Sequence, residues 1–153
     1  MVINIRRSRP DEGDKLIAIW CRSVDATHDF LSKAYRKELE EMVRAFLPEA
    51  PLWVAVNTED QPIAFMLLTG DHMDALFVDP DVRGCGVGRL LIAHALSLTP
   101  TLTTNVNEQN EQAVGFYQKM GFRVTGRSET DDLGQPYPLL NLMYEQQAEA
   151  DYD

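Results

Sequence analysis

The sequence has few cysteines and no long apolar segment. Its 153 residues include two cysteines, Cys21 and Cys85. Their spacing matches neither a metal-ligand motif nor a redox motif, so we expect no metal site and no disulfide framework. The longest apolar run, residues 63–68, has six residues, whereas a membrane-spanning helix needs about 20. Because the first residues also lack the apolar stretch of a secretion signal, we expect a soluble cytoplasmic protein with no membrane partner.

Basic residues are also scarce. The chain has 14 Lys and Arg against 24 Asp and Glu, which gives a formal net charge of −10 at pH 7. Proteins that bind nucleic acids derive much of their affinity from Lys and Arg at phosphates, so this balance argues against a nucleic-acid partner. An acidic surface attracts cations instead, which favours an amine or a lysine-bearing protein as the partner.

The length suits one domain, since single domains commonly have about 100–200 residues. Nine glycines and eight prolines are close to average usage and exclude a low-complexity protein. We expect a single domain over residues 1–144, followed by an acidic, frayed tail over 145–153.

Hydrophobic periodicity predicts a mixed α/β chain. Three short strands between residues 52 and 78 are joined by brief turns and form an antiparallel meander. Ser32 is an expected N-cap, and Pro48 ends the helix that begins there. The other predicted helices cover 11–24, 88–98 and 110–120, and the predicted strands cover 2–6, 52–56, 63–69, 73–78, 102–106, 122–129 and 139–144.

The junction between the third meander strand and the next helix carries the most informative motif. A glycine-rich turn, Arg83-Gly-Cys-Gly-Val-Gly-Arg89, opens the helix. The first amides of a helix have no intrahelical acceptor and carry a partial positive charge, so they bind anions. Glycines let these amides approach a ligand closely. With an arginine at each end, the turn predicts a phosphate or pyrophosphate site.

The glycine spacing separates this turn from the common nucleotide motifs. In a G-x-G-x-x-G dinucleotide motif the last glycine would fall on Arg89 or Leu91, and the P-loop sequence Gly-Lys-Ser/Thr is absent. The observed pattern, Arg83-x-x-Gly86-x-Gly88, resembles the pyrophosphate loop of the GNAT acyltransferases.

A second block supports the resemblance. Residues 105–122 resemble the other GNAT signature, an asparagine-led helix that ends in Phe-Tyr-x-x-x-Gly-Phe. Asn110 and Tyr117 are seven residues apart, so they share one helix face and lie about 10.5 Å apart along its axis. Asn110 is also a good helix cap, a role compatible with a cofactor contact.

The resemblance implies the GNAT fold, with a twisted, mostly antiparallel central sheet that splays between its fourth and fifth strands and is flanked by four helices. It implies direct transfer of an acetyl group from acetyl-CoA to a primary amine through a ternary complex, the amine being a protein lysine, an N-terminal amine or a small molecule. In that mechanism Tyr117 is the general acid, a main-chain amide near Val78 stabilises the oxyanion, and Cys85 is an inert small side chain. The implied acetyl-CoA contacts are Leu76, Phe77, Val78, Arg83, Gly84, Cys85, Gly86, Val87, Gly88, Arg89, Asn107, Asn110, Ala113, Phe116 and Tyr117.

The general base is less clearly marked. Asp74 lies four residues before Val78 and so shares its strand face, and His28 lies in the polar connection between the first two helices. We expect one of these two to relay the amine proton, while His72 and Glu108 are less well placed. Asp74 and His28 could instead be ordinary polar residues.

Two other functions and the oligomeric state stay open at this point. A module that senses acyl-CoA without turnover is one alternative. A nucleotide-binding oxidoreductase is the other, although Arg89 stands where its motif needs a glycine. Monomer and homodimer are both compatible with the sequence.

Overall fold

The structure is a computed structural model that describes residues 2–145. The predicted tail, apart from Glu145, lies outside these residues. The strands are β1 (Asn4–Arg7), β2 (Trp53–Val56), β3 (Pro62–Thr69), β4 (His72–Val78), β5 (Thr103–Asn107), β6 (Phe122–Ser128) and β7 (Leu139–Tyr144). The helices are α1 (Gly13–Thr27), α2 (Lys33–Phe46), α3 (Val87–Leu98) and α4 (Glu111–Met120), with single 3-10 turns η1 (Pro10–Glu12), η2 (Leu47–Glu49) and η3 (Pro80–Val82).

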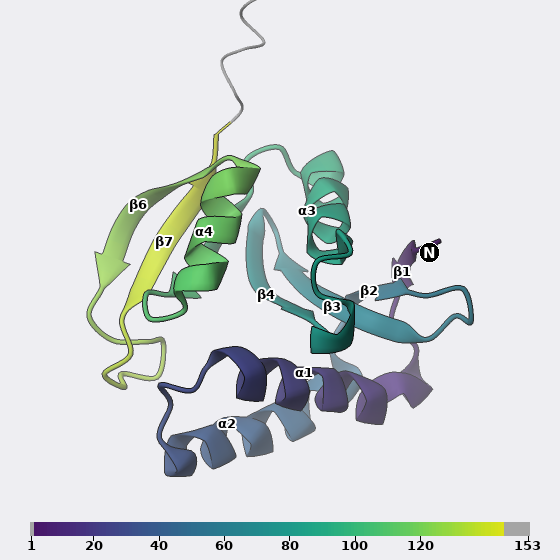
Figure 1. Cartoon of the computed structure of the whole chain (residues 1–153), viewed down its shortest axis with the longest axis horizontal. Coiled ribbons are helices and arrows are strands. Elements are labelled where there is room, and N and C mark those ends of the chain that lie inside the picture. Colours follow the sequence, from purple (N-terminus) through teal and green to yellow (C-terminus); the bar gives the residue numbers. More distant parts are fainter. Residues whose placement is uncertain (1, 146–153) are drawn as a thin grey trace, which may run out of the picture.

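The strands form one sheet in the order β1-β2-β3-β4-β5-β7-β6. Every neighbouring pair is antiparallel except β4 and β5, which are parallel. Helices α1 and α2 cover one face of the sheet, and α3 and α4 cover the other (Figure 1). The predicted meander and the mixed α/β fold are therefore confirmed.

Two apolar clusters hold the layers together. Leu91, Ile92 and Ala95 of α3 pack on Met66 and Met73 of the sheet. On the opposite face, α1 contributes its helix-period apolar residues, which pack on strand residues of the other parity. The members of this second cluster include Leu16, Ile17, Trp20, Val54 and Phe65.

The sheet opens between β4 and β5. These strands pair only through His72 with Thr103 and Met73 with Thr104, near the start of β4. Residues 75–78 of β4 pair with β3 but not with β5. The predicted splay is thus confirmed, and it leaves a gap in the centre of the sheet.

β4 contains a β-bulge at Asp74. Two adjacent residues of β3 pair with Met73 and Ala75, so Asp74 is the extra residue. Met73 and Val78, an odd number of residues apart, both pack under α3, and Asp74 bonds with Thr69 on the opposite face. The prediction that Asp74 shares the face of Val78 is wrong, because a bulge reverses the alternation of side chains.

The described residues contain no helix that is both long and apolar enough to cross a membrane.

Candidate functional site

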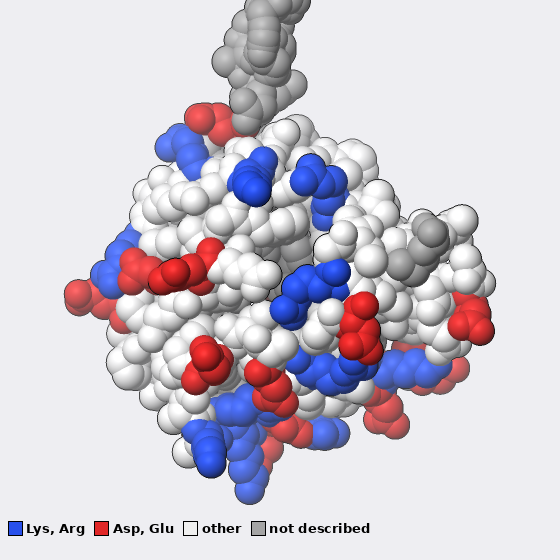
Figure 2. All heavy atoms as spheres, viewed as in Figure 1, with Lys and Arg blue, Asp and Glu red and all other residues white. Residues whose placement is uncertain are grey.

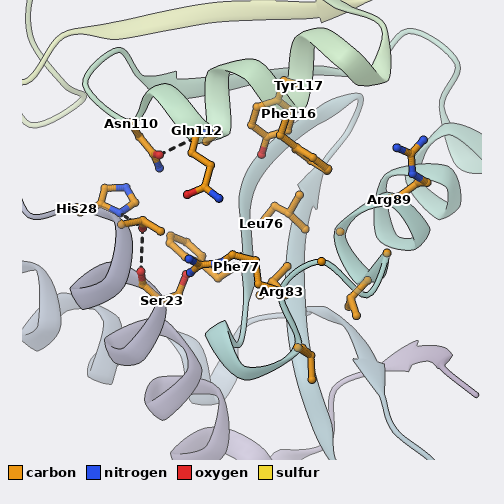
Figure 3. Close-up of a pocket in the computed structure, with 18 residues that line it drawn as sticks. Ser23, His28, Leu76, Phe77, Arg83, Arg89, Asn110, Gln112, Phe116 and Tyr117 are labelled. Atoms are coloured by element: carbon orange, nitrogen blue, oxygen red, sulfur yellow. Dashed lines mark hydrogen bonds between the residues drawn. The ribbon is translucent and has the colours of Figure 1, made fainter. Parts of the chain in front are cut away.

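A cavity of about 490 Å³ lies between the C-terminal half of β4, the start of α3, and α4 (Figure 3). The end of α1 closes its remaining side. Most of the residues predicted from the two motifs line it, so residues 76–89 and 110–117 come together at one site. These lining residues are Leu76, Phe77, Val78, Arg83, Gly84, Gly86, Val87, Gly88, Arg89, Asn110, Ala113, Phe116 and Tyr117.

The glycine-rich turn presents main-chain amides to this cavity. Gly86 is the N-cap of α3 at φ 81°, a left-handed conformation that favours glycine. The amides of Val87, Gly88 and Arg89 have no intrahelical acceptor because they open the helix. Gly86 also supplies no side-chain cap that could accept from them. The first turn of α3 is therefore a set of unpaired donors with the positive end of a helix dipole behind it.

Gly88 is required for close packing between α3 and α4. A Cβ atom at this position would lie 3.3 Å from Cζ of Phe116 and 3.7 Å from Cγ2 of Val78. These contacts show that the two helices and β4 meet tightly at the wall of the cavity. A larger side chain at Gly88 would displace Phe116 or narrow the site.

Arg83 and Arg89 flank the turn and are available to an anion. Within residues 2–145 neither makes an ion pair or a side-chain hydrogen bond, whereas nearby Arg22 bonds to Asp79 at 3.1 Å and Asp81 at 2.6 Å. Figure 2 shows basic side chains on several sides of the hollow at the centre of this face. Arg22 offsets one of the two negative charges that precede the turn, and the guanidinium groups of Arg83 and Arg89 leave a local excess of positive charge despite the net charge of the chain.

The main-chain groups of Leu76 and Val78 point into the gap between β4 and β5. The amide of Asp79 donates to the carbonyl of Ile63 at 2.9 Å, which makes these two a hydrogen-bonded pair. Hydrogen-bonded and non-hydrogen-bonded pairs alternate in an antiparallel ladder, so Val78, opposite Ala64, directs its N–H and C=O away from β3. The same holds for Leu76, and the splay leaves both residues open to a ligand.

Tyr117 lies at the inner end of the cavity. Its side chain is 7% exposed, and burial raises the pKa of its hydroxyl above the ordinary value. The hydroxyl makes no hydrogen bond among the described residues, and Figure 3 shows it directed into the cavity. Tyr117 is therefore a protonated donor without a protein acceptor.

A smaller hollow of about 180 Å³ lies on the other side of Tyr117, between β4 and β5. Asn107 and Asp74 line this hollow, while His28, Asn110 and Tyr117 line both. Asn110 is the N-cap of α4, and its side chain accepts from the amide of Ala113 at 3.3 Å. The predicted cap is confirmed, and the residue also faces the site.

The two candidate bases differ in their surroundings. His28 caps the C-terminus of α1, its Nδ1 lies 2.7 Å from Oγ1 of Thr27, and burial lowers the pKa of its imidazole. Asp74 is half exposed, bonds with Thr69 and lies 3.8 Å from Nε2 of His72. The neutral His28 ring is thus suited to accept a proton, and Asp74 lies at the mouth of the smaller hollow.

Some predicted residues lie elsewhere, and some lining residues were not predicted. Cys85 is exposed and lines neither cavity. His72, which contacts Thr103, and Glu108, which pairs with Arg127, also line neither cavity. Four lining residues had no signal in the sequence: the two from α1 reach the site only through the tertiary fold, and the other two, from η3 and α4, lie beside residues that were predicted. They are Ser23, Thr27, Val82 and Gln112.

No group of three or more His, Cys, Asp or Glu side chains within residues 2–145 could hold a metal ion.

Comparison with known proteins identifies the family. A family model described as an acetyltransferase (GNAT) domain matches residues 12–136. The chain belongs to the GNAT acetyltransferase family. Over 144 residues it is 78% identical to the peptidyl-lysine N-acetyltransferase YjaB of Escherichia coli K12, covering 94% of this chain and 98% of that protein.

Solved structures support the same assignment. The solution structure of the apo form of E. coli YjaB has a TM-score of 0.93 and 77% identity, covering 96% of this chain and all of that one. The PaiA N-acetyltransferase of Thermoplasma acidophilum, solved in complex with coenzyme A, has a TM-score of 0.76 at 18% identity over 95% of this chain and all of that one. The latter likeness shows the fold alone.

The GNAT protein is therefore an acyltransferase, and the oxidoreductase alternative no longer applies. The expectations of a cytoplasmic location, of no metal requirement, and of a monomer or homodimer stay predictions.

Proposed function

We propose that this GNAT protein transfers the acetyl group of acetyl-CoA directly to the ε-amino group of a protein lysine. The observation that carries the proposal is the convergence of three features on one cavity: unpaired amides at the start of α3, open main-chain groups on β4, and the buried hydroxyl of Tyr117. The lysine acceptor is supported by the name of the relative that is 78% identical to this chain.

The residues present fit coenzyme A. The first amides of α3, with Arg83 and Arg89, bind the diphosphate through charge-assisted hydrogen bonds. Asn107, Asn110, Ala113 and Phe116 line the path from there to Tyr117 and contact the pantetheine arm, together with Leu76, Phe77 and Val78 of β4. When bound, acetyl-CoA supplies an activated acyl group held as a thioester.

Tyr117 is the general acid. Its hydroxyl stays protonated at neutral pH because burial raises its pKa, and it donates that proton to the departing sulfur. The amide of Val78, directed into the gap, stabilises negative charge as it develops on the acyl oxygen.

His28 is the favoured base. A lysine amine with a pKa of about 10.4 must lose a proton, which costs about 4.6 kcal/mol at pH 7. Because burial lowers the pKa of His28, its ring is neutral and accepts this proton, directly or through a water molecule. Asp74, which lines the smaller hollow, is the second candidate and attracts the ammonium group.

Transfer is direct, within a ternary complex. The residues described around both cavities include no cysteine, and Cys85 lies exposed on the outer side of its loop. A covalent acetyl-cysteine step therefore has no nucleophile at the site.

The test is an acetyl-transfer assay with peptides read by mass spectrometry. A peptide that contains one lysine and a blocked N-terminus is expected to gain the mass of one acetyl group, and the same peptide with Lys replaced by Arg is expected to remain unmodified. Binding of acetyl-CoA without transfer to any lysine peptide would contradict the proposal and favour the non-catalytic sensing module. Initial-rate patterns that intersect would support the ternary complex, and parallel patterns would contradict it.

A further inference from the structure

Two loops beside the site form a continuous acidic rim. The rim consists of residues 25–32, at the end of α1, and residues 128–138, between β6 and β7, and it contains five carboxylates but no Lys or Arg. Figure 1 shows the two loops side by side. They come together from positions about 100 residues apart in the chain.

The two halves of the rim are fixed to each other. The amide of Ser32 donates to the hydroxyl oxygen of Tyr137 at 3.0 Å. The rings of Tyr35 and Tyr137 are stacked, with centroids 5.2 Å apart and planes 3° apart, and the Tyr35 hydroxyl donates to Asp131. The rim is therefore a built surface and not two independent loops.

Three rim carboxylates are free to meet an external cation. Asp25 is paired with Arg36 at 2.8 Å, and Asp131 accepts from Tyr35. Asp29, Glu129 and Asp132 are exposed and make no ion pair or side-chain hydrogen bond within residues 2–145. Most other carboxylates named as paired on this surface lie beside arginines, whereas these three have no ion-pair partner, and Arg127, which borders the rim, pairs with Glu108.

The rim leads directly to the reaction site. His28 belongs to the rim and also lines both cavities beside Tyr117. Tyr117 is 7% exposed, its hydroxyl has no hydrogen-bond partner among the described residues, and it lines the same two cavities as His28. The ring centroid of Phe30 lies 5.3 Å from that of His28 and 6.1 Å from that of Tyr137, so an apolar ring connects the two loops along the rim.

We propose that the rim selects acceptor lysines that have basic neighbours in their own sequence. This inference rests on the proposed lysine acetyltransferase activity and names its substrate class: a protein segment with Lys or Arg on either side of the acceptor. One exposed ion pair changes affinity by roughly 1.5- to 5-fold, so three free carboxylates together give a preference of about 10-fold. The preference falls with salt, because exposed charges are screened beyond about 8 Å at physiological ionic strength.

The first test uses the unmodified enzyme and three peptides. Each has blocked termini and one central lysine, flanked on both sides by Arg, by Gln or by Glu. The expected order of kcat/KM is Arg above Gln above Glu, with about 10-fold between the Arg and Gln peptides at low salt, carried by KM. At about 0.5 M NaCl the difference is expected to shrink to about 2-fold.

A matched pair of variants locates the effect. The triple variant Asp29→Asn, Glu129→Gln and Asp132→Asn is expected to lose the preference for the Arg peptide while keeping KM for acetyl-CoA and kcat/KM for the Gln peptide. The control removes three exposed carboxylates that make no ion pair and lie outside the rim, through the substitutions Asp14→Asn, Glu49→Gln and Glu59→Gln. It changes the net charge equally and is expected to keep the preference.

The outcomes separate this inference from the proposed function. Equal kcat/KM for all three peptides, or equal effects of the two triple variants, would overturn the basic-context preference and leave lysine acetylation intact. Spermidine acetylated more efficiently than every peptide would also overturn it, in favour of a small polyamine. Failure to acetylate any peptide would contradict the proposed function and this inference together.

Discussion

The two ends of the active site are built in different ways. The α3 end uses main-chain amides from one local turn, residues 83–89, with two arginines that have no other partner in the described chain. The opposite end uses residues from the end of α1, from β4 and from β5, which only the tertiary fold brings together. The first arrangement suits any diphosphate of matching shape, and the second can differ between proteins that share the fold.

This difference explains why the family was evident from the sequence and the acceptor was not. A helix N-terminus with glycines binds an anion through groups that every residue has, so the spacing of glycine and arginine is sufficient to mark it. An acceptor site depends on which side chains meet across distant loops. Breaking each end separately should therefore change different kinetic constants.

The largest effect is expected at Tyr117, where the two ends meet. Tyr117→Phe removes the hydroxyl proposed as the general acid, and general acid catalysis contributes about 10²- to 10⁴-fold. We expect kcat to fall at least 100-fold with little change in the Kd of CoA. Steady-state rates and calorimetry measure the two quantities.

The control for this substitution is Tyr144→Phe, since Tyr144 also packs edge-on against Phe122, at 5.6 Å, but lines neither cavity. It should leave kcat unchanged. A Tyr117→Phe enzyme with kcat within 3-fold of the original would remove Tyr117 as the acid.

The α3 end is tested by the double variant Arg83→Gln and Arg89→Gln. Each arginine loses a charge-assisted hydrogen bond to phosphate, which in an exposed position corresponds to about 10-fold in Kd. Calorimetry should show CoA affinity reduced by up to about 100-fold, with a weaker salt dependence. The variant Lys33→Gln and Lys37→Gln makes the same charge change on α2 and should bind CoA normally, whereas equal losses in both variants would indicate a general charge effect.

The acceptor end is tested by pH dependence. Burial lowers the pKa of His28, so its base form is present at neutral pH and is lost only as pH falls below the ordinary histidine pKa of about 6.5. The same shift makes folding less favourable as pH decreases through that range, because the unfolded chain binds the proton more readily. His28→Gln should flatten the acidic limb of kcat/KM and reduce the rate at pH 7.5 by about 10-fold, since water can replace the base in part.

Two further variants sharpen the assignment of the base. His72→Gln should keep the limb, because His72 lines neither cavity. If Asp74→Asn removes the limb and His28→Gln does not, the base is Asp74.

The smallest effect is expected at the glycine turn. Gly86→Ala places a side chain at φ 81°, and the left-handed region costs an L residue roughly 1–2 kcal/mol. Gly70→Ala, at φ 62° in the β3–β4 turn, carries a similar strain away from the site. Both should lower the melting temperature, but only Gly86→Ala should weaken CoA binding, by about 3- to 10-fold. Equal CoA affinities would show that the turn does not hold the cofactor.

Much of the fold followed from the sequence because its elements have strong local signals. The apolar stripe of α1, the Ser32 cap, which accepts from the amide of Tyr35, and the terminal Gly121 of α4 are all local features, and the predicted element order is confirmed. The position of Asp74 could not be predicted, because the bulge depends on how β3 and β4 are paired.

The contribution of α1 to the site was hidden for a similar reason. This helix continues to Thr27, three residues beyond its last predicted residue, and so carries His28 to the cavity as its C-cap. The pairing of Tyr35 with Asp131 joins residues 96 positions apart, and no local pattern indicates it.

We propose that the unpaired amides at the start of α3 hold the diphosphate of coenzyme A. A titration of the ¹⁵N-labelled protein with CoA, followed by amide NMR, tests it most directly. We expect the largest shifts at Gly84, Gly86, Val87, Gly88 and Arg89. Saturable binding that leaves these five amides unchanged and shifts another segment would contradict it.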